Sequence, residues 1–425
     1  MNSPSRVSAA TLGLPVLLLA ALSFPWIALA MPWDPDESRY LEIGREMAQG
    51  GDWLVPTLNG VPYLEKPPLY LWALAAVFKL FGPSALAARL VSVFSAAGVV
   101  VLTSWLGALW GGRASGLRTG VVLAACPLFL VLSTIVTLDM FLTLWVTAGV
   151  AAFVYGIGSS EEERPRRGLA ILLGYFALGL AVLTKGPVAI AVPGLVWLCW
   201  RPARARFDVV PLRSLVVLPP RLVAGSAIFL LVAAPWFVWT SARVPGFADF
   251  FFVKGNLGRL SGADGQGVNT HGQPFYFYLP VLLGGSAPWI AFLAAPWRVL
   301  REELRAGSWP RLAWSWIVPG LLFFSLVAGK LPAYVLPLFP GVALLLGRRW
   351  TQVAAGEHPR AWGIGAGAII VLAAVAVAGV VLAAVFRPWE GIWWAPLLDR
   401  SLAVLACAGL GAGGACILLL LARGT

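Results

Sequence analysis

Uninterrupted apolar blocks of about 20 residues recur along this chain, and a helix of roughly that length crosses a bilayer. Of the 425 residues, 59% are hydrophobic and only 12% are charged, whereas an average soluble domain carries roughly 25% charged residues. Backbone polar groups in hydrocarbon must be satisfied within the protein, so such blocks fold as helices. The sequence therefore predicts an all-α polytopic membrane protein and excludes a soluble enzyme of ordinary composition.

We expect about twelve transmembrane helices, at residues 11–30, 84–110, 115–133, 137–156, 168–184, 187–200, 222–241, 276–297, 311–328, 332–347, 362–386 and 399–421. Pro67–Phe81 is apolar but short, which favours a juxtamembrane or re-entrant helix. The first block ends Ala28-Leu29-Ala30 and so also resembles a signal-peptide cleavage site. Its length favours a retained helix, and in either case the segment after it faces outward.

The net charge of +12 is common in nucleic-acid-binding proteins, but the distribution of basic residues argues against a nucleic-acid partner. Most arginines fall in short loops that lie on one side if the N-terminus is inside, as the positive-inside rule requires. All five lysines fall on the other side, at positions 66, 79, 185, 254 and 330. We therefore expect an inner-membrane protein with a cytoplasmic N-terminus, and we expect the outward lysines to have a function of their own.

The sequence offers no soluble chemistry and no metal site. It contains no Walker loop, no HExxH and no zinc-spaced cluster, and its two histidines fall on opposite sides. The four cysteines lie inside apolar blocks, where they act as small hydrophobic residues. We expect no metal or cofactor, so an activated substrate would have to come from the membrane itself.

The first outside loop, residues 31–83, begins with an acidic helix start. Asp34, Pro35 and Glu37 match a helix cap, a first-turn proline and a capping-box glutamate, which leaves Asp36 free to point elsewhere. The alternative is that Asp36 and Glu37 only complement the helix dipole. The helix is predicted to be amphipathic and to lie at the membrane surface. One face would carry Tyr40, Ile43, Gly44 and Met47, and the other Glu42, Arg45, Glu46 and Gln49.

Four further charged residues fall at outward turns or helix ends. Lys66 precedes two prolines at a helix start, where backbone N–H groups favour an anion. Asp139 lies in an apolar stretch, where a carboxylate costs roughly 3 kcal/mol or more unless it is paired or hydrated. Lys185 and Lys330 each occupy a tight turn flanked by Gly or Pro. Snorkelling at the interface would explain one such lysine, but two on the acidic side indicate a site.

The second outside loop, residues 242–275, runs from Phe250-Phe251-Phe252 through Lys254 to Arg259 and a glycine-rich stretch. These aromatic and basic residues fit an interfacial belt. They equally fit an amphipathic lid that presents an arginine to a phosphate, because guanidinium binds phosphate bidentately. Residues 261–273 have the composition of a gating loop.

Together the outside loops supply carboxylates and cations of the kind that chemistry on a lipid-linked phosphate requires. Cations hold the phosphate, and a carboxylate orients or deprotonates the attacking group. A transporter or flippase for a lipid-linked sugar is the alternative, since intramembrane charge is also its hallmark. Transporters usually bind at the midplane between internal repeats, and no repeat is evident here. A purely structural membrane protein would leave the segregated lysines and carboxylates unexplained.

Five motifs occur in order along the chain: Asp36-Glu37-Ser38-Arg39-Tyr40, Tyr63-Leu64-Glu65-Lys66-Pro67, Thr137-Leu138-Asp139, Leu183-Thr184-Lys185-Gly186 and Gly329-Lys330-Leu331-Pro332-Ala333-Tyr334. In these motifs the chain resembles the bacterial aminoarabinose transferase (ArnT)-like branch of the protein mannosyltransferase superfamily, over about residues 10–350. The resemblance implies a GT-C fold and a sugar donor on undecaprenyl phosphate. It also implies inverting transfer at the periplasmic face, in that branch onto lipid A phosphate.

The same resemblance implies roles for individual residues. Asp36 would be the essential catalytic carboxylate, and Asp139 would support it. The carrier phosphate would be held by Lys66, Arg259, Lys330 and Tyr334. The substrate pocket would be lined by Glu37, Arg39, Tyr40, Tyr63, Glu65 and Lys185.

The chain departs from that branch at two places, and both concern the acceptor and the sugar more than the carrier. Lys254-Gly255-Asn256 stands where the branch has an acidic residue and a histidine. The branch also ends in a soluble periplasmic domain, which we do not expect here. We expect a catalytic GT-C module over residues 1–350, with periplasmic loops 31–83 and 242–275, and only transmembrane helices over 351–425. The acceptor is expected to be lipid A, another glycolipid or a glycan.

Overall fold

The structure, a computed structural model, describes residues 7–29, 36–158, 164–200, 220–258, 273–293 and 308–356. The expected spans 362–386 and 399–421 lie outside the described residues, as does Arg259. Asp36 is described through its backbone alone. The proposed division of the chain at residue 350 therefore stays a prediction.

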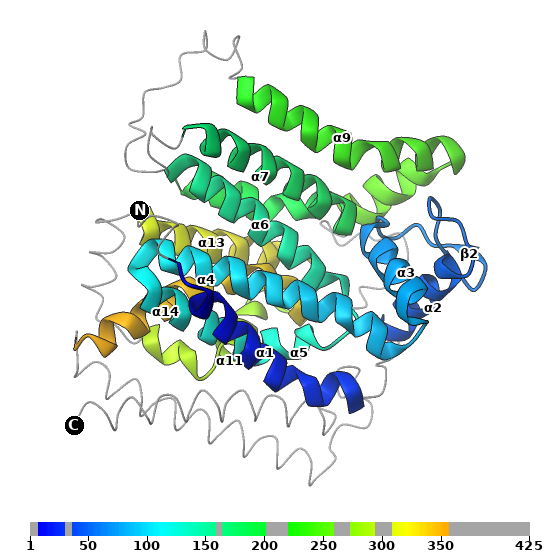
Figure 1. Cartoon of the computed structure of the whole chain (residues 1–425). Coiled ribbons are helices and arrows are strands. Elements are labelled where there is room, and N and C mark those ends of the chain that lie inside the picture. The colour runs from blue at the N-terminus through cyan, green and yellow to red at the C-terminus, as the bar shows by residue number, and fades with distance from the viewer. Residues whose placement is uncertain are drawn as a thin grey trace.

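The described part of the chain is a bundle of helices with one short β-hairpin (Figure 1). In it, four helices are long and apolar enough to cross a membrane: α4 (Ala85–Ala124), α6 (Leu138–Gly158), α7 (Arg164–Lys185) and α9 (Pro220–Arg243). The other long helices are α1 (Ala9–Leu29), α13 (Ser308–Leu326) and α14 (Phe339–Ala354). Helix α4 packs against α1, α6 and α14, and α7 lies between α6 and α9. This arrangement confirms the predicted all-α polytopic fold.

Several expected spans are interrupted where proline or glycine breaks the helical hydrogen bonding. The expected span 276–297 begins as α11 (Tyr278–Gly285) and continues as the 3₁₀ helix η6 (Trp289–Leu293). The span 332–347 starts as the 3₁₀ helix η7 (Pro332–Leu338) before α14, and 187–200 as η3 (Pro187–Ile190) before α8 (Ala191–Cys199). Helix α4 kinks at Gly111–Gly112, where the expected spans 84–110 and 115–133 separate, but the second span breaks again before α5 (Pro127–Ser133). The predicted uninterrupted helices are wrong within 115–133, 187–200, 276–297 and 332–347.

The amphipathic helix expected in the first outside loop is α2 (Asp36–Ala48). Tyr40, Ile43 and Met47 are buried, as predicted, and pack against α3 (Leu69–Phe81). At 13 residues α3 is about 20 Å long, too short to cross roughly 30 Å of hydrocarbon. It therefore does not span the membrane, as expected for either a juxtamembrane or a re-entrant helix.

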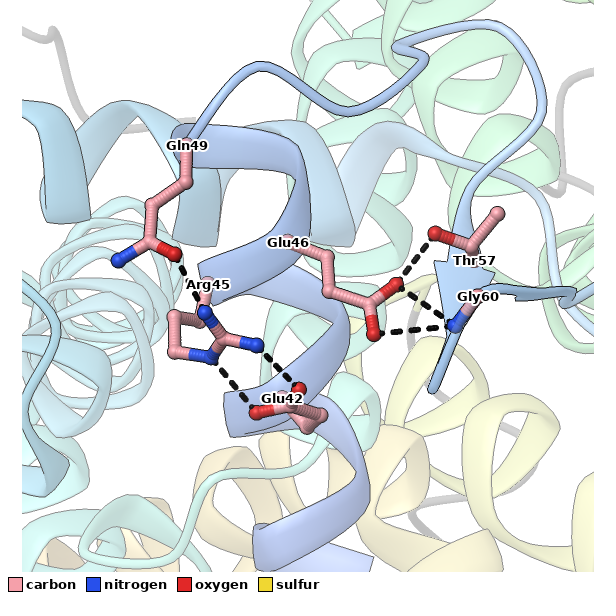
Figure 2. A network of polar contacts seen from close by, with 6 residues as sticks. All are labelled: Glu42, Arg45, Glu46, Gln49, Thr57 and Gly60. Atoms are coloured by element: carbon pink, nitrogen blue, oxygen red, sulfur yellow. Dashed lines mark hydrogen bonds and ion pairs between the residues drawn. The ribbon is translucent and has the colours of Figure 1, made fainter.

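The exposed face of α2 carries a polar network that holds the hairpin of β1 (Thr57–Leu58) and β2 (Val61–Pro62) (Figure 2). The Glu46 carboxylate accepts hydrogen bonds from the Thr57 hydroxyl and, at 3.3 Å, from the Gly60 N–H. Arg45 pairs with Glu42 one turn away on the same helix, with its Nε 2.8 Å from Glu42 Oε2. The Glu46 carboxylate thus holds the hairpin against α2, whereas the Glu42 carboxylate binds a residue of its own helix.

Loops that are distant in sequence meet at the end of the bundle where α2 and α3 lie (Figure 1). The Trp236 indole, near the end of α9, donates to the Leu54 carbonyl at 2.8 Å. Arg243 pairs with Asp52 at 3.0 Å, and Trp236 packs with Phe247 and Phe251. We call this the charged end of the bundle. It comprises α2, α3, the hairpin and the chain at residues 134–139, 183–187 and 328–334.

Candidate active site

The start of α2 is tied into the bundle by a buried ion pair. Glu37 and Arg89, on α4, have side chains that are 1% and 3% exposed. Arg89 Nη2 lies 3.0 Å from Glu37 Oε2, and the Val136 N–H donates to Glu37 Oε1 at 2.6 Å. Arg89 Nη1 also donates to the Ile27 carbonyl of α1 at 3.4 Å. The Glu37 carboxylate is thus engaged inside the protein, behind the exposed surface of α2, and Asp36 precedes it.

Asp139 lies in the first turn of α6 and forms an ion pair with Lys185, at the end of α7. The Lys185 ammonium also sits 4.1 Å from the centroid of the Tyr334 ring, within cation–π range. The Thr137 hydroxyl donates to Asp139 Oδ2 at 3.3 Å. Three of the predicted site residues, from three elements, are therefore in one contact group.

The turn after Lys185 lets a neighbouring segment approach closely. Gly186 has a φ of +86°, a conformation that side chains disfavour. A Cβ added there would lie 3.0 Å from the Phe251 ring. Phe251 belongs to the π-helical segment η5 (Asp249–Gly258), which packs directly on the end of α7 because position 186 has no side chain.

Lys330 is a buried cation, with 4% of the residue exposed. Its ammonium donates to the Gln273 carbonyl at 3.1 Å, and within the described ranges no carboxylate lies within ion-pair distance of it. Burial lowers the pKa of Lys330, because the charged form loses hydration. A buried ammonium held by a carbonyl is well suited to bind an anion from outside the protein.

Tyr63 brings together a second group of predicted pocket residues. It is 6% exposed, and burial raises its pKa to about 12, with a further contribution from the Glu65 carboxylate and opposition from Arg39. The Tyr40 hydroxyl is a neighbour as well. Lys66 follows, half-buried, directly before the buried prolines that lead into α3. Tyr63 of the loop thus lies beside Arg39 and Tyr40 of α2.

Two residues were missed from the sequence. Arg89 stands near the start of an expected span, and a charge in an apolar block indicates a buried partner; this signal was available. Tyr278, in α11, is fully buried and lies within electrostatic reach of Tyr334 and Asp139. It stands in an aromatic run typical of an interfacial belt, so no local pattern distinguishes it.

Lys254, expected as an interfacial or lid cation, pairs with Asp249 at 3.1 Å, and both side chains are more than half exposed. Arg259 and the Asp36 carboxylate lie outside the described part of the structure, and their roles stay predictions. Within the described ranges, no group of three or more His, Cys, Asp or Glu side chains is arranged to hold a metal ion.

The fold and the charged end define a class: polytopic helical membrane proteins of the GT-C type. Residues 9–251 match the model of the dolichyl-phosphate-mannose-protein mannosyltransferase family. The chain belongs to this family.

Individual relatives agree with this assignment. An undecaprenyl phosphate-alpha-4-amino-4-deoxy-L-arabinose arabinosyl transferase of Enterobacter sp. (strain 638) is 34% identical over 379 residues, 89% of this chain and 64% of that protein. A transferase of the same name from Yersinia pestis (strain Pestoides F) is 33% identical and aligns with 90% of this chain and 67% of its own length. The chain thus spans about two thirds of the length of these relatives. The predicted resemblance is confirmed.

Solved structures show the same relationship. The crystal structure of ArnT from Cupriavidus metallidurans bound to undecaprenyl phosphate matches with a TM-score of 0.75 and 28% identity, over 97% of this chain and 77% of that chain. The archaeal oligosaccharyltransferase AglB from Archaeoglobus fulgidus, with 12% identity and a TM-score of 0.51 over 94% of this chain and 55% of that one, shares the fold.

Proposed function

We propose that the chain is an integral membrane glycosyltransferase. It moves a sugar from undecaprenyl phosphate, or a similar polyprenyl phosphate, to lipid A or another envelope glycolipid or glycan, with inversion at the sugar. The observation that carries this proposal is Lys330, a buried ammonium with no carboxylate nearby among the described residues, at the same end as the Asp139–Lys185 pair. The Cupriavidus metallidurans relative, whose structure contains undecaprenyl phosphate, supports a carrier of this kind.

In the proposed reaction the acceptor oxygen attacks the anomeric carbon as the bond from that carbon to the carrier phosphate breaks. The polyprenyl phosphate leaves with the bonding electrons, and Lys330, Lys66, Arg259 and Tyr334 bind its growing negative charge. With a hydroxyl acceptor, Asp36 takes the proton as general base. With a phosphate acceptor, which is already anionic, Asp36 instead positions it or stabilises charge developing on the sugar.

The pair of Asp139 and Lys185 supports the pocket in this proposal. Because the two side chains are joined, Asp139 adds little net negative charge beside an anionic carrier. Lys185 in turn holds the ring of Tyr334 through its cation–π contact. The pair therefore fixes a wall of the site and leaves the phosphate to Lys330 and its neighbours.

We further propose that the charged end faces the periplasm and that the N-terminus is cytoplasmic. The arginine-rich loops support this orientation, since such loops stay inside, and the lysine-bearing turns lie at the opposite ends of their helices. The relatives named above are bacterial, which supports the inner membrane as the location.

The decisive experiment is donor consumption by the purified chain in detergent, with undecaprenyl phosphate-α-4-amino-4-deoxy-L-arabinose as donor and lipid A as acceptor. Mass spectrometry should show release of undecaprenyl phosphate. Asp36→Asn should lower turnover at least about 100-fold, the contribution of a positioned base, with an unchanged yield of folded protein. Near-normal transfer by this variant would contradict the assignment. A flippase would consume no donor in detergent, which separates the two candidate classes.

A further inference from the structure

One buried carboxylate is tied to both segments that carry the candidate acidic residues. Glu37 follows Asp36 at the start of α2 and pairs with Arg89 of α4 at 3.0 Å. Its other oxygen accepts a hydrogen bond from the Val136 N–H at 2.6 Å. Val136 lies just before α6, which carries Asp139 in its first turn. A single side chain therefore joins α2, α4 and the turn that leads to Asp139.

The same turn has a second tie to α4. The Ser92 hydroxyl, one helical turn beyond Arg89, donates to the Ile135 carbonyl at 2.7 Å. The Ile135 carbonyl and the Val136 N–H belong to one planar peptide unit. Both polar atoms of that unit are therefore bound by side chains that α4 holds in place, which fixes the orientation of the peptide and the path of the chain into α6.

Stability alone does not explain a pair of this kind. Glu37 and Arg89 are almost fully buried, and the desolvation of a buried ion pair roughly cancels its Coulombic attraction. Apolar residues of similar size often serve a core equally well. What an ion pair adds is a fixed geometry between α2, which begins at Asp36, and α4, and the bond from Val136 to Glu37 extends this to the turn before Asp139.

We propose that Glu37 and Arg89 are positioning residues, which set the place of Asp36 relative to Asp139 for sugar transfer. This inference rests on the function proposed above. Glu37→Gln keeps an acceptor for Val136 but loses the charge that attracts Arg89, so the start of α2 can shift. A misplacement of about 1 Å at a reacting centre costs on the order of 100-fold in rate.

The test is steady-state kinetics of donor consumption by the full chain, with the donor and acceptor used above. Glu37→Gln should lower kcat about 10- to 100-fold and leave the donor KM within about twofold, because the phosphate-binding cations are untouched. Arg89→Lys, which keeps a cation, should retain more activity than Arg89→Gln. Addition of undecaprenyl phosphate should raise the melting temperature of Glu37→Gln as much as that of the unmodified chain.

A matched control lies on the same helix. Glu42→Gln removes an ion pair from the exposed face of α2 (Figure 2) and should leave kcat and KM unchanged. Ser92→Ala removes the other tie to the turn without leaving a buried charge unpaired, and should lower kcat roughly threefold, the effect of one neutral hydrogen bond. If Glu37→Gln fails to accumulate, the kcat of Ser92→Ala tests the positioning role.

A rise in donor KM at constant kcat in Glu37→Gln would overturn the inference, since it would place Glu37 at the phosphate. Unchanged kcat in Ser92→Ala, or an equal loss in Glu42→Gln, would also overturn it. If the unmodified chain consumes no donor, the proposed function fails first. If Asp36→Asn is inactive and Glu37→Gln is normal, only the positioning role fails.

Discussion

The charged end and the crossing of α1, α4 and α14 are both tightly packed, but they are built from different side chains. The charged end buries Glu37, Arg89, Asp139 and Lys330. The crossing is built mainly on glycines and hydroxyl residues, although Arg349 of α14 is buried as well. A Cβ added to Gly347 of α14 would lie 2.5 Å from the Cα of Thr119 on α4, and one added to Gly120 would lie 2.6 Å from Pro15 of α1.

This difference suggests separate roles for the two regions: the crossing holds the helices of the bundle together, and the charged end carries the candidate active site. Helices in lipid associate through close backbone approach at small residues, and the glycines of the crossing allow that approach. Each ionised group near the membrane costs free energy unless it is paired. At the charged end Glu37 pairs with Arg89 and Asp139 with Lys185, whereas no carboxylate of the described residues lies within ion-pair distance of Lys330, so a bound anion would offset the charge of Lys330.

The largest effect should come from removing the buried cation. Lys330→Ala should raise the donor KM about 10- to 100-fold, since a charge-assisted hydrogen bond contributes about 1.5–3 kcal/mol, and should change kcat at saturating donor much less. Steady-state kinetics with varied donor measures both constants. Lys254→Ala, which breaks an exposed pair, is the control. A loss confined to kcat would show that Lys330 does not bind the phosphate.

A methyl group added at the crossing should lower stability and leave the donor KM unchanged, the reverse of the effect expected for Lys330→Ala. Gly347→Ala forces α14 away from α4 and should cost about 1–3 kcal/mol of stability, as overpacking does, with an unchanged donor KM in the folded fraction. Thermal unfolding in detergent measures the loss. Gly194→Ala is the control, because a Cβ there meets nothing within 4 Å. Equal melting temperatures for the two variants would remove the contrast between the two regions.

The pH dependence of donor binding and of stability should run in opposite directions for Lys330. Its pKa is lowered by burial, so as pH rises through that pKa the ammonium is lost and the donor KM should increase, at most about tenfold per pH unit. The unfolded chain holds this proton up to higher pH, so the group's contribution to stability rises over the same range.

Comparison with Lys330→Met isolates the effect of this one group. Without donor, the difference in melting temperature between the two proteins should shrink as pH rises toward 10.5, the ordinary lysine pKa. A constant difference across that range would mean that Lys330 is not a penalised buried cation.

The smallest effect is expected from an exposed ion pair at the same end. Asp52→Asn breaks the contact with Arg243, whose side chain is 60% exposed, and surface pairs contribute about 0–1 kcal/mol. Melting temperature and both kinetic constants should stay close to those of the unmodified chain. A large loss of turnover would extend the functional region to the link between loop 31–83 and α9.

The sequence predicted those features that depend on local pattern or on the cost of charge. The two faces of α2 follow from helical periodicity, and Asp139 was expected to be paired or hydrated because it lies in an apolar stretch. The sequence did not name a partner for Asp139, since Lys185 is brought to it by the packing of α6 on α7.

Other features depend on tertiary contacts that no local pattern encodes. Glu37 fits a capping box, yet its carboxylate meets Arg89, more than fifty residues away in the chain. The helix breaks at Pro288 and Pro337 were missed because hydropathy measures only the apolar character of a block, not its backbone hydrogen bonds.

Gly186 is an uncharged residue of the charged end whose size affects how η5 packs on α7. The ring of Phe251 in η5 packs against this position, where a Cβ would lie 3.0 Å from it, and η5 directly precedes Arg259 in the chain. An alanine at position 186 would crowd the Phe251 ring and so displace η5 from the end of α7. A single methyl group at this position would then alter the proposed transfer reaction while every ionisable group stayed intact, so surveys of natural variants should weigh this position as heavily as the acids and amines around it.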